Sequence, residues 1–169
     1  MFLFCYIDLP GCGTIGSCSQ TCDQPAAYIM TPGFPSYYQS DATCFWKIKG
    51  AYGQFVKFSF INLDIIDNSD SPCEKSYISV FDVDLQDNIN SLGKFCKANR
   101  PYEPFVSSWH NMHIEFRASS DNKPGFGFLG KYSIESFSQK SFNNDSFKGQ
   151  FRTIYFPVTP LFVIFKQSE

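Results

Sequence analysis

The sequence has few of the residues that catalytic and metal sites need. Only two of its 169 residues are histidines, His110 and His113, and no two cysteines have the Cys-x-x-Cys spacing of zinc sites. Neither histidine stands in a Gly-x-Ser-x-Gly or His-Glu-x-x-His motif, and their segment alternates like a strand, so we expect them on opposite faces. Gly125, Gly127 and Gly130 cluster in a strand-closing motif, where turn and packing roles are sufficient. We therefore predict no catalytic residues, no cofactor and no enzymatic activity of this chain alone.

Charge is scarce as well, and no apolar run is long enough to cross a membrane. The 14 basic and 16 acidic residues leave a net charge of −2. A chain without a basic excess lacks the field that binds a phosphate backbone, so nucleic acid is not an expected partner. The apolar stretch 153–165 contains Pro157 and Pro160 and has 13 residues, whereas a membrane-spanning helix needs about 20. We expect an edge strand or an adhesive tail there, and we predict no transmembrane segment.

Aromatic residues and turn formers are abundant instead. The chain has 20 Phe, 9 Tyr, 11 Gly and 10 Pro, a composition that favours strands and turns over helix bundles. Apolar and polar residues alternate over 44–49, 56–61, 77–80 and 112–117. Turn-forming sequences separate these segments, at 31–35, 50–53, 67–72 and 121–125. Since no segment shows the 3.6-residue period of a helix, we predict an all-β domain, either a β-sandwich or a barrel.

The cysteines indicate disulfide bonds rather than a metal site. There are seven of them: Cys5, Cys12, Cys18, Cys22, Cys44, Cys73 and Cys96. Structural disulfides form in oxidising compartments such as the extracellular space. Because the number is odd, at least one cysteine is free or pairs with another chain. The sequence suggests no role for Cys5 or Cys12.

Six segments, in order along the chain, resemble the CUB domain, an extracellular β-sandwich module of complement proteases, tolloid-like proteases, cubilin and spermadhesins. They are residues 29–38, 44–48, 53–64, 73–96, 107–116 and 127–132. The last is similar to the family's closing Gly-Phe-x-Ala-x-Tyr, with Gly130 in place of alanine. The resemblance covers residues 18–134 and implies an antiparallel β-sandwich of two sheets, of the jelly-roll type.

The two ends of the chain lie outside this resemblance. We expect residues 1–17 to be the remnant of a preceding module or a poor signal sequence. Residues 135–169 are expected to form a linker or a disordered tail. They contain the sequon Asn144-Asp145-Ser146, which would be glycosylated if the segment enters the secretory pathway.

The resemblance also implies two disulfide bonds. Cys73 and Cys96 match the family's second pair. The partner of Cys44 is either Cys18 or Cys22. The family's first cysteine stands well before the opening strand, which favours Cys18, although Cys22 is close enough to compete.

Many CUB domains bind calcium at one end of the sandwich through clustered carboxylates, and the resemblance bears on this site. Three acidic residues of the family's calcium site correspond to Ile66, Ser76 and Ser119 in this sequence, so all three carboxylates are lost. Three nearby residues are weak candidates for a shifted site: Asp64, Asp67 and Asp121. We expect solvated loop carboxylates there and no metal. The loss also removes the basis for any ion-dependent capture of a partner's lysine.

Aromatic side chains are the remaining candidates for a binding site. Tyr37, Tyr38 and Tyr52 lie in or near expected loops, where a rigid scaffold would present them, unless they simply cap the core. We predict a secreted, extracellular, non-catalytic CUB module that recognises a protein or a glycan within a larger protein, in an oligomeric state that the sequence does not give. One alternative is the C-terminal fragment of an astacin-like zinc metalloprotease that lacks its catalytic domain. Another is a stand-alone secreted protein similar to the spermadhesins.

Overall fold

The structure is a computed structural model that describes residues 11–12, 18–121 and 123–137. These ranges hold nine strands and one short 3-10 helix, Lys97–Asn99. None of their helices is long and apolar enough to cross a membrane. Most of the 1–17 segment lies outside the described residues, as do residues 138–169 with the sequon and the apolar stretch 153–165.

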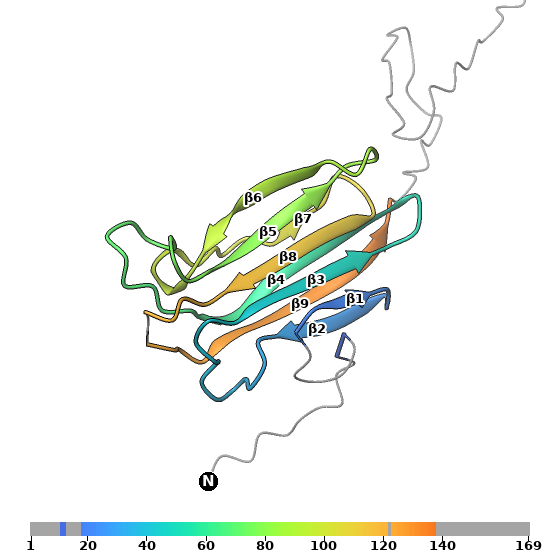
Figure 1. Cartoon of the computed structure of the whole chain (residues 1–169). Helices are drawn as coiled ribbons and strands as arrows, with labels where there is room; N and C mark the ends of the chain where they lie inside the picture. Colours follow the sequence, from blue (N-terminus) through green and yellow to red (C-terminus); the bar gives the residue numbers. More distant parts are fainter. Residues whose placement is uncertain (1–10, 13–17, 122, 138–169) are drawn as a thin grey trace, which may run out of the picture. The chain divides into compact units, whose positions relative to one another are not determined.

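The strands form two facing sheets (Figure 1). The five-stranded sheet has the order β1 (Gln20–Cys22), β3 (Thr43–Lys49), β8 (Asn111–Arg117), β5 (Tyr77–Val83) and β6 (Ile89–Phe95). The four-stranded sheet has the order β2 (Ala26–Met30), β9 (Gly127–Ser136), β4 (Gln54–Asp64) and β7 (Phe105–Val106). Neighbouring strands are antiparallel except β1, which runs parallel to β3. The predicted two-sheet antiparallel β-sandwich is confirmed, with a parallel edge strand that the sequence pattern did not reveal.

Alternation along the strands places one face of each sheet in the core. In β3, Trp46 and Ile48 are buried whereas Lys47 and Lys49 are exposed. The Trp46 indole meets Phe128 of the other sheet edge-on, with ring centroids 5.3 Å apart. Large apolar side chains from both inner faces therefore leave water together, which is the main driving force for this fold.

Gly130 makes room for a phenylalanine ring between β9 and β4. A Cβ atom at Gly130 would lie 2.4 Å from Cε2 of Phe58, well inside van der Waals contact. The Phe58 ring is fully buried and packs edge-on against Phe60, with ring centroids 4.9 Å apart. The departure from the alanine of the CUB motif is thus explained, because the ring occupies the space that the methyl group would need.

We expect Gly130→Ala to destabilise the domain by about 1–3 kcal/mol, the usual cost of overpacking a core. A smaller side chain at position 58 should recover part of this loss in the double variant Gly130→Ala/Phe58→Leu. Urea unfolding of the two single variants and the double variant measures the coupling between the positions. Strictly additive losses would contradict the packing explanation.

Three disulfide bonds join the described cysteines. They are Cys73–Cys96, Cys18–Cys44 and Cys12–Cys22, with Cα–Cα distances of 5.4, 4.7 and 5.3 Å. Cys44 is bonded to Cys18, since Cys22 has another partner. Cys5 lies outside the described residues.

The Cys12–Cys22 bond attaches the start of the described chain to both sheets. Cys22 belongs to β1 of the five-stranded sheet. The backbone N–H of Cys12 donates to the carbonyl of Tyr28 on β2 of the four-stranded sheet, at 3.0 Å. The disulfide bond and this hydrogen bond together link the edge strands β1 and β2, which belong to different sheets. At the other end of the chain, Phe137 N–H donates to Gly53 O at 3.1 Å, so contacts extend beyond the 18–134 range of the resemblance on both sides.

The connections between strands gather at two ends of the sandwich. Residues Thr43 and Tyr77, which begin β3 and β5, both pair with Arg117 at the end of β8. This register brings together the loops 31–42, 65–76, 96–104 and 118–126, which we call the loop end. The shorter connections 50–53, 84–88 and 107–110 form the opposite end, which we call the turn end.

Candidate functional site

The loop end contains the three positions at which the CUB resemblance expects acidic residues. The N–H of Ser119 donates to Oγ of Ser76 at 2.9 Å. The N–H of Ile66 donates to the Tyr38 hydroxyl oxygen at 3.3 Å. Hydroxyl groups and backbone N–H donors therefore bond to one another where the resemblance expects carboxylates.

Asp67 shapes its own loop. Its carboxylate accepts hydrogen bonds from the N–H of Glu74 at 2.8 Å, from the N–H of Ser76 at 3.2 Å and from the Ser69 hydroxyl. Because these donors belong to the same connection between β4 and β5, Asp67 fixes the path of residues 67–76 as a turn carboxylate does.

Asp64, at the end of β4, is engaged by a lysine. Lys97 Nζ lies 2.7 Å from Asp64 Oδ1, and the Phe126 N–H donates to Oδ2 at 2.9 Å. Partial burial raises the pKa of Asp64, but the hydrogen bonds from Lys97 and Phe126 and the charge of Lys97 outweigh it, so the pKa is below its ordinary value. The hydrogen bond to Asp64, followed by its charge, raises the pKa of Lys97. The ammonium group thus occupies the side of this carboxylate that a cation would need.

Asp121 lies apart from the other two candidates. Its Oδ2 is 3.6 Å from Lys75 Nζ, and both side chains are mostly exposed, so the pair contributes little to stability. Each of the three candidate carboxylates therefore has a different set of partners. Among the described residues, no group of three His, Cys, Asp or Glu side chains is arranged to hold a metal ion.

Two exposed aromatic rings stack at the loop end. Tyr37 is 62% exposed and Phe126 is 46% exposed, and their rings lie 4.8 Å apart at an interplanar angle of 13°. Tyr38, next in sequence, is only 3% exposed and packs edge-on against Phe116 at 5.2 Å. The prediction that Tyr38 is a surface binding residue is wrong, because its ring belongs to the core.

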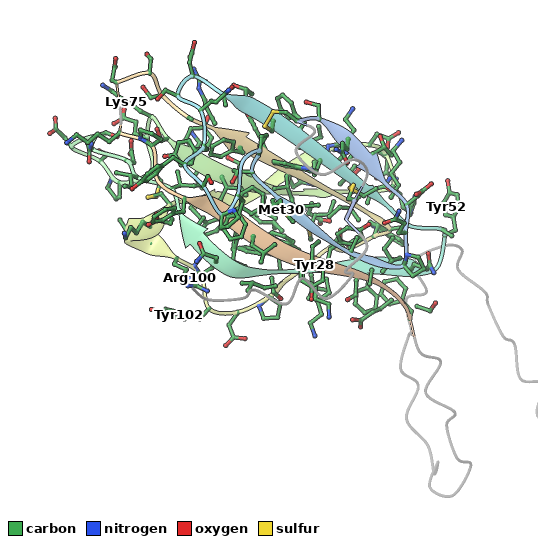
Figure 2. All side chains as sticks on the ribbon, turned by 90° about the horizontal axis from the view of Figure 1, so that it is seen from below. Tyr28, Met30, Tyr52, Lys75, Arg100 and Tyr102 are labelled. Carbon is green, nitrogen blue, oxygen red and sulfur yellow. A yellow bond between two sulfur atoms is a disulfide. The ribbon has the colours of Figure 1, made fainter. Side chains whose placement is uncertain are left out.

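Tyr52 is exposed but lies at the turn end. Its side chain is 75% exposed, and its ring contacts that of His110 with centroids 4.8 Å apart. Figure 2 shows Tyr52 at the opposite end of the domain from Lys75, a loop-end residue. Tyr37 and Tyr52 therefore belong to two separate surfaces.

Phe126 is held in place by Asp64. Its N–H is bound by the Asp64 carboxylate, and the neighbouring Gly125 carbonyl accepts a hydrogen bond from Tyr38 N–H at 3.2 Å. A Cβ atom at Gly125 would lie 2.0 Å from the Asp64 carbonyl oxygen, so only glycine permits this close approach. Contacts thus run from Lys97 through Asp64 to the exposed rings, which are presented on a braced backbone.

The sequence analysis did not identify Phe126 as a candidate. A phenylalanine between two glycines, directly after a turn-forming sequence, does not fit the alternation of a core strand. That local sequence is the signal by which an exposed ring could have been expected.

The two histidines lie on different surfaces. His110 precedes β8 at the turn end, whereas His113 is on the outer face of the five-stranded sheet, paired with Lys47 of β3. Burial lowers the pKa of His113, the charges of Lys47 and Lys49 lower it further, and Asp87 opposes them.

We expect His113 to make stability fall as the pH is lowered from about 7 to about 5. The unfolded chain takes up a proton near pH 6.5, whereas the folded chain does so only at lower pH. The stabilisation is therefore complete above pH 6.5 and is lost below it. His113→Gln should weaken this pH dependence, and urea unfolding at both pH values measures it. His110→Gln is the matched control, and an unchanged pH dependence in His113→Gln would contradict the assignment.

A shallow depression lies on the outer face of the four-stranded sheet. Its volume is about 190 Å³, and it is lined by Lys57, Ser59, Lys131, Tyr132, Ser133 and Glu135. Pockets that bind small molecules usually measure about 300–1,000 Å³. The lining contains no histidine or cysteine that could act as a nucleophile or an imidazole base.

Two facing sheets, with three disulfide bonds among the described cysteines and the longer loops at one end, define a disulfide-bonded β-sandwich module. The CUB domain family matches residues 18–132 of this sequence. This match covers more than half of the chain, and the chain belongs to the CUB domain family. The matched domain is a non-catalytic module.

Curated relatives contain this module within longer proteins. Tumor necrosis factor-inducible gene 6 protein of Homo sapiens is 29% identical over 115 residues, which are 68% of this chain and 40% of that protein. Tolloid-like protein 2 of Homo sapiens is 30% identical over 141 residues, which are 83% of this chain and 13% of that protein. The chain therefore spans less than half the length of either relative.

Solved structures show the same fold. The CUB1-EGF-CUB2 domains of rat MASP-1 match with a TM-score of 0.60 and 21% identity, over 75% of this chain and 46% of that chain. The MASP-1 CUB2 domain bound to Ca2+ matches with a TM-score of 0.58 and 25% identity, over 67% of this chain and 96% of that chain.

Proposed function

We propose that this chain is a non-catalytic extracellular module that recognises a protein or a glycan through its loop end. The observation that carries the proposal is the stacked pair Tyr37–Phe126, whose rings are 62% and 46% exposed. Exposed rings of this size are costly to leave in water, and they are the side chains that most often anchor an interface.

The surroundings of the pair support a binding role. Phe126 is fixed through Asp64 and Lys97, so its ring loses little conformational freedom when a partner binds. The pairs Lys97–Asp64 and Lys75–Asp121 lie at the same loop end, and their charged groups would supply a polar rim. The rings also stack flat against each other, which presents a broad surface to a partner's apolar side chain or to the apolar face of a sugar ring.

An extracellular setting fits the chemistry of the fold. Three disulfide bonds among the described residues require an oxidising compartment to form and persist. We infer that the module extends from residue 11 to residue 137. Cys12 forms a disulfide bond with Cys22 of β1, and the Phe137 N–H donates to the Gly53 carbonyl. Since the chain spans 40% and 13% of two curated relatives, we infer that it works as one part of a larger secreted or ectodomain protein.

We expect the double variant Tyr37→Ala/Phe126→Ala to lose at least about tenfold in affinity for its partner, because two anchoring rings are removed. The parent chain is first screened against an array of extracellular proteins and a glycan array. The affinities for the ligands found are then measured by surface plasmon resonance. The melting temperature should change little, because both rings are on the surface.

Tyr52→Ala is the control, since it removes an exposed ring at the turn end. Full binding by Tyr37→Ala/Phe126→Ala would overturn the loop-end assignment. A large loss of stability in that variant would show that the rings belong to the core instead.

A second candidate concerns the whole protein. Similarity to Tolloid-like protein 2 extends over 141 residues, beyond the matched CUB segment. This favours the alternative in which the chain is the C-terminal part of an astacin-like zinc metalloprotease. A longer transcript that encodes a His-Glu-x-x-His helix upstream would decide for it, and a complete transcript without one would decide against it.

A further inference from the structure

Basic side chains gather on the outer face of the five-stranded sheet. The exposed residues Lys47 and Lys49 point outward from β3, because they alternate with the buried Trp46 and Ile48. Arg117 is exposed at the end of β8. Lys94 of β6 lies over the ring of Tyr77, 4.2 Å from its centroid. We call this surface, together with His113, Phe45 and Phe81, the cationic face.

The pairing of the strands places these residues in adjacent rows. Lys47 is opposite His113, which in turn is opposite Phe81. A second row contains Phe45, Glu115, Ser79 and Lys94. Because neighbouring strands are about 4.8 Å apart, the backbones of β3 and β6 are roughly 14 Å apart. The basic groups are thus spread over a broad and flat surface.

The cations of this face form no salt bridge with another described residue. The two ion pairs among the described residues, Lys75–Asp121 and Lys97–Asp64, are both at the loop end. Glu115 is the one acidic residue in the rows of this face, and Asp84 and Asp87 lie in the adjoining turn 84–88. The four permanent cations, Lys47, Lys49, Lys94 and Arg117, exceed these three carboxylates by one, on a chain whose net charge is −2. This face therefore carries a small excess of positive charge and no salt bridge among the described residues.

We propose that the cationic face binds a sulfated polysaccharide. Such a polymer carries anionic groups at short intervals and can lie along a flat row of lysines, with no pocket required. Phe45 is 45% exposed between these cations, and its ring can pack against the C–H face of a sugar. The inference depends on the extracellular setting of the proposed function, since sulfated polysaccharides are the abundant polyanions outside cells and nucleic acids are not.

The surface fits this ligand better than it fits an acidic protein. Interfaces between proteins usually have an apolar core, whereas the apolar side chains of this face, Phe45, Phe81 and Ile89 at its edge, are spread among charged groups. Binding of a polyanion by separate lysines is electrostatic, and it weakens as the salt concentration rises.

The test is the affinity of the whole chain for heparin, measured by surface plasmon resonance at several salt concentrations. Lys47→Gln/Lys49→Gln should bind at least about tenfold more weakly at 0.15 M salt, with a smaller salt dependence. Arg117→Gln should weaken binding by about two- to fivefold, since one cation of four is removed. Both variants should melt at the temperature of the parent chain, because the side chains are exposed.

Lys57→Gln/Lys131→Gln is the matched control, because it removes the same charge from two exposed positions on the other sheet. An equal loss of affinity in this control would overturn the site, since only net charge would then matter. Binding of single-stranded DNA as tight as that of heparin would overturn the assignment to a polysaccharide. Tyr37→Ala/Phe126→Ala should bind heparin as the parent chain does, so failure of this proposal and failure of the loop-end proposal are separate results.

Discussion

Replacing Gly127 with alanine is expected to destabilise the domain by about 2–5 kcal/mol, a large fraction of the stability of a typical domain. Gly127 begins β9 with φ +85°, a conformation that costs a residue with a side chain about 1–2 kcal/mol. A Cβ atom there would also lie 1.9 Å from Thr31 Oγ1. Thr31 is fully buried and its hydroxyl accepts the Phe128 N–H, so it cannot move aside without breaking that hydrogen bond.

Gly53→Ala is the matched control for this prediction. Gly53 has a similar φ of +82°, but its added Cβ would meet no atom within 4 Å. This variant should lose only the conformational part, about 1–2 kcal/mol. Urea unfolding of both variants separates the two contributions. Equal losses would show that the contact with Thr31 has no influence.

The second large effect is expected on removal of the Cys73–Cys96 disulfide. Replacing both cysteines with serine should lower the free energy of unfolding by about 2–5 kcal/mol, and the melting temperature by roughly 10 °C or more. The bond ties the connection between β4 and β5 to the end of β6, across 23 positions of sequence. Both residues are buried, so the serine hydroxyl groups would also replace apolar contacts.

This disulfide should also affect binding at the loop end. Lys97 follows Cys96 directly, and its N–H donates to the Ile65 carbonyl at 2.9 Å. Loss of the disulfide should therefore loosen the Lys97–Asp64 contact that braces Phe126. Differential scanning calorimetry and the affinity for the array ligand measure the two effects. A melting temperature within about 2 °C of the parent would contradict the structural role of the bond.

The sandwich could be predicted from the sequence because buried and exposed residues alternate along its strands. In β3, the alternation expected from the sequence is observed: Cys44, Trp46 and Ile48 are buried, and Phe45, Lys47 and Lys49 are exposed. The parallel strand β1 has only three residues, too few for a pattern, and its pairing with β3 depends on contacts distant in sequence. The Cys12–Cys22 bond escaped prediction because its position follows from β1 lying beside β3.

The candidate site was only partly predictable, since exposure depends on tertiary contacts. Tyr37 and Tyr38 are neighbours in a turn-rich loop and look alike in sequence. The Tyr38 ring points inward and its oxygen accepts from the Ile66 N–H, a partner 28 positions away. The Tyr37 ring points outward onto Phe126, which is 89 positions away. No local pattern distinguishes these two outcomes.

Hydrogen–deuterium exchange of the chain, with and without the ligand found on the arrays, tests the central claim most directly. The claim is that this CUB module recognises its partner with the aromatic pair at the loop end. We predict that binding slows exchange in residues 31–42 and 123–128, which carry Tyr37 and Phe126. Protection confined to the turn end, around Tyr52 and His110, with no change in these two segments, would contradict it.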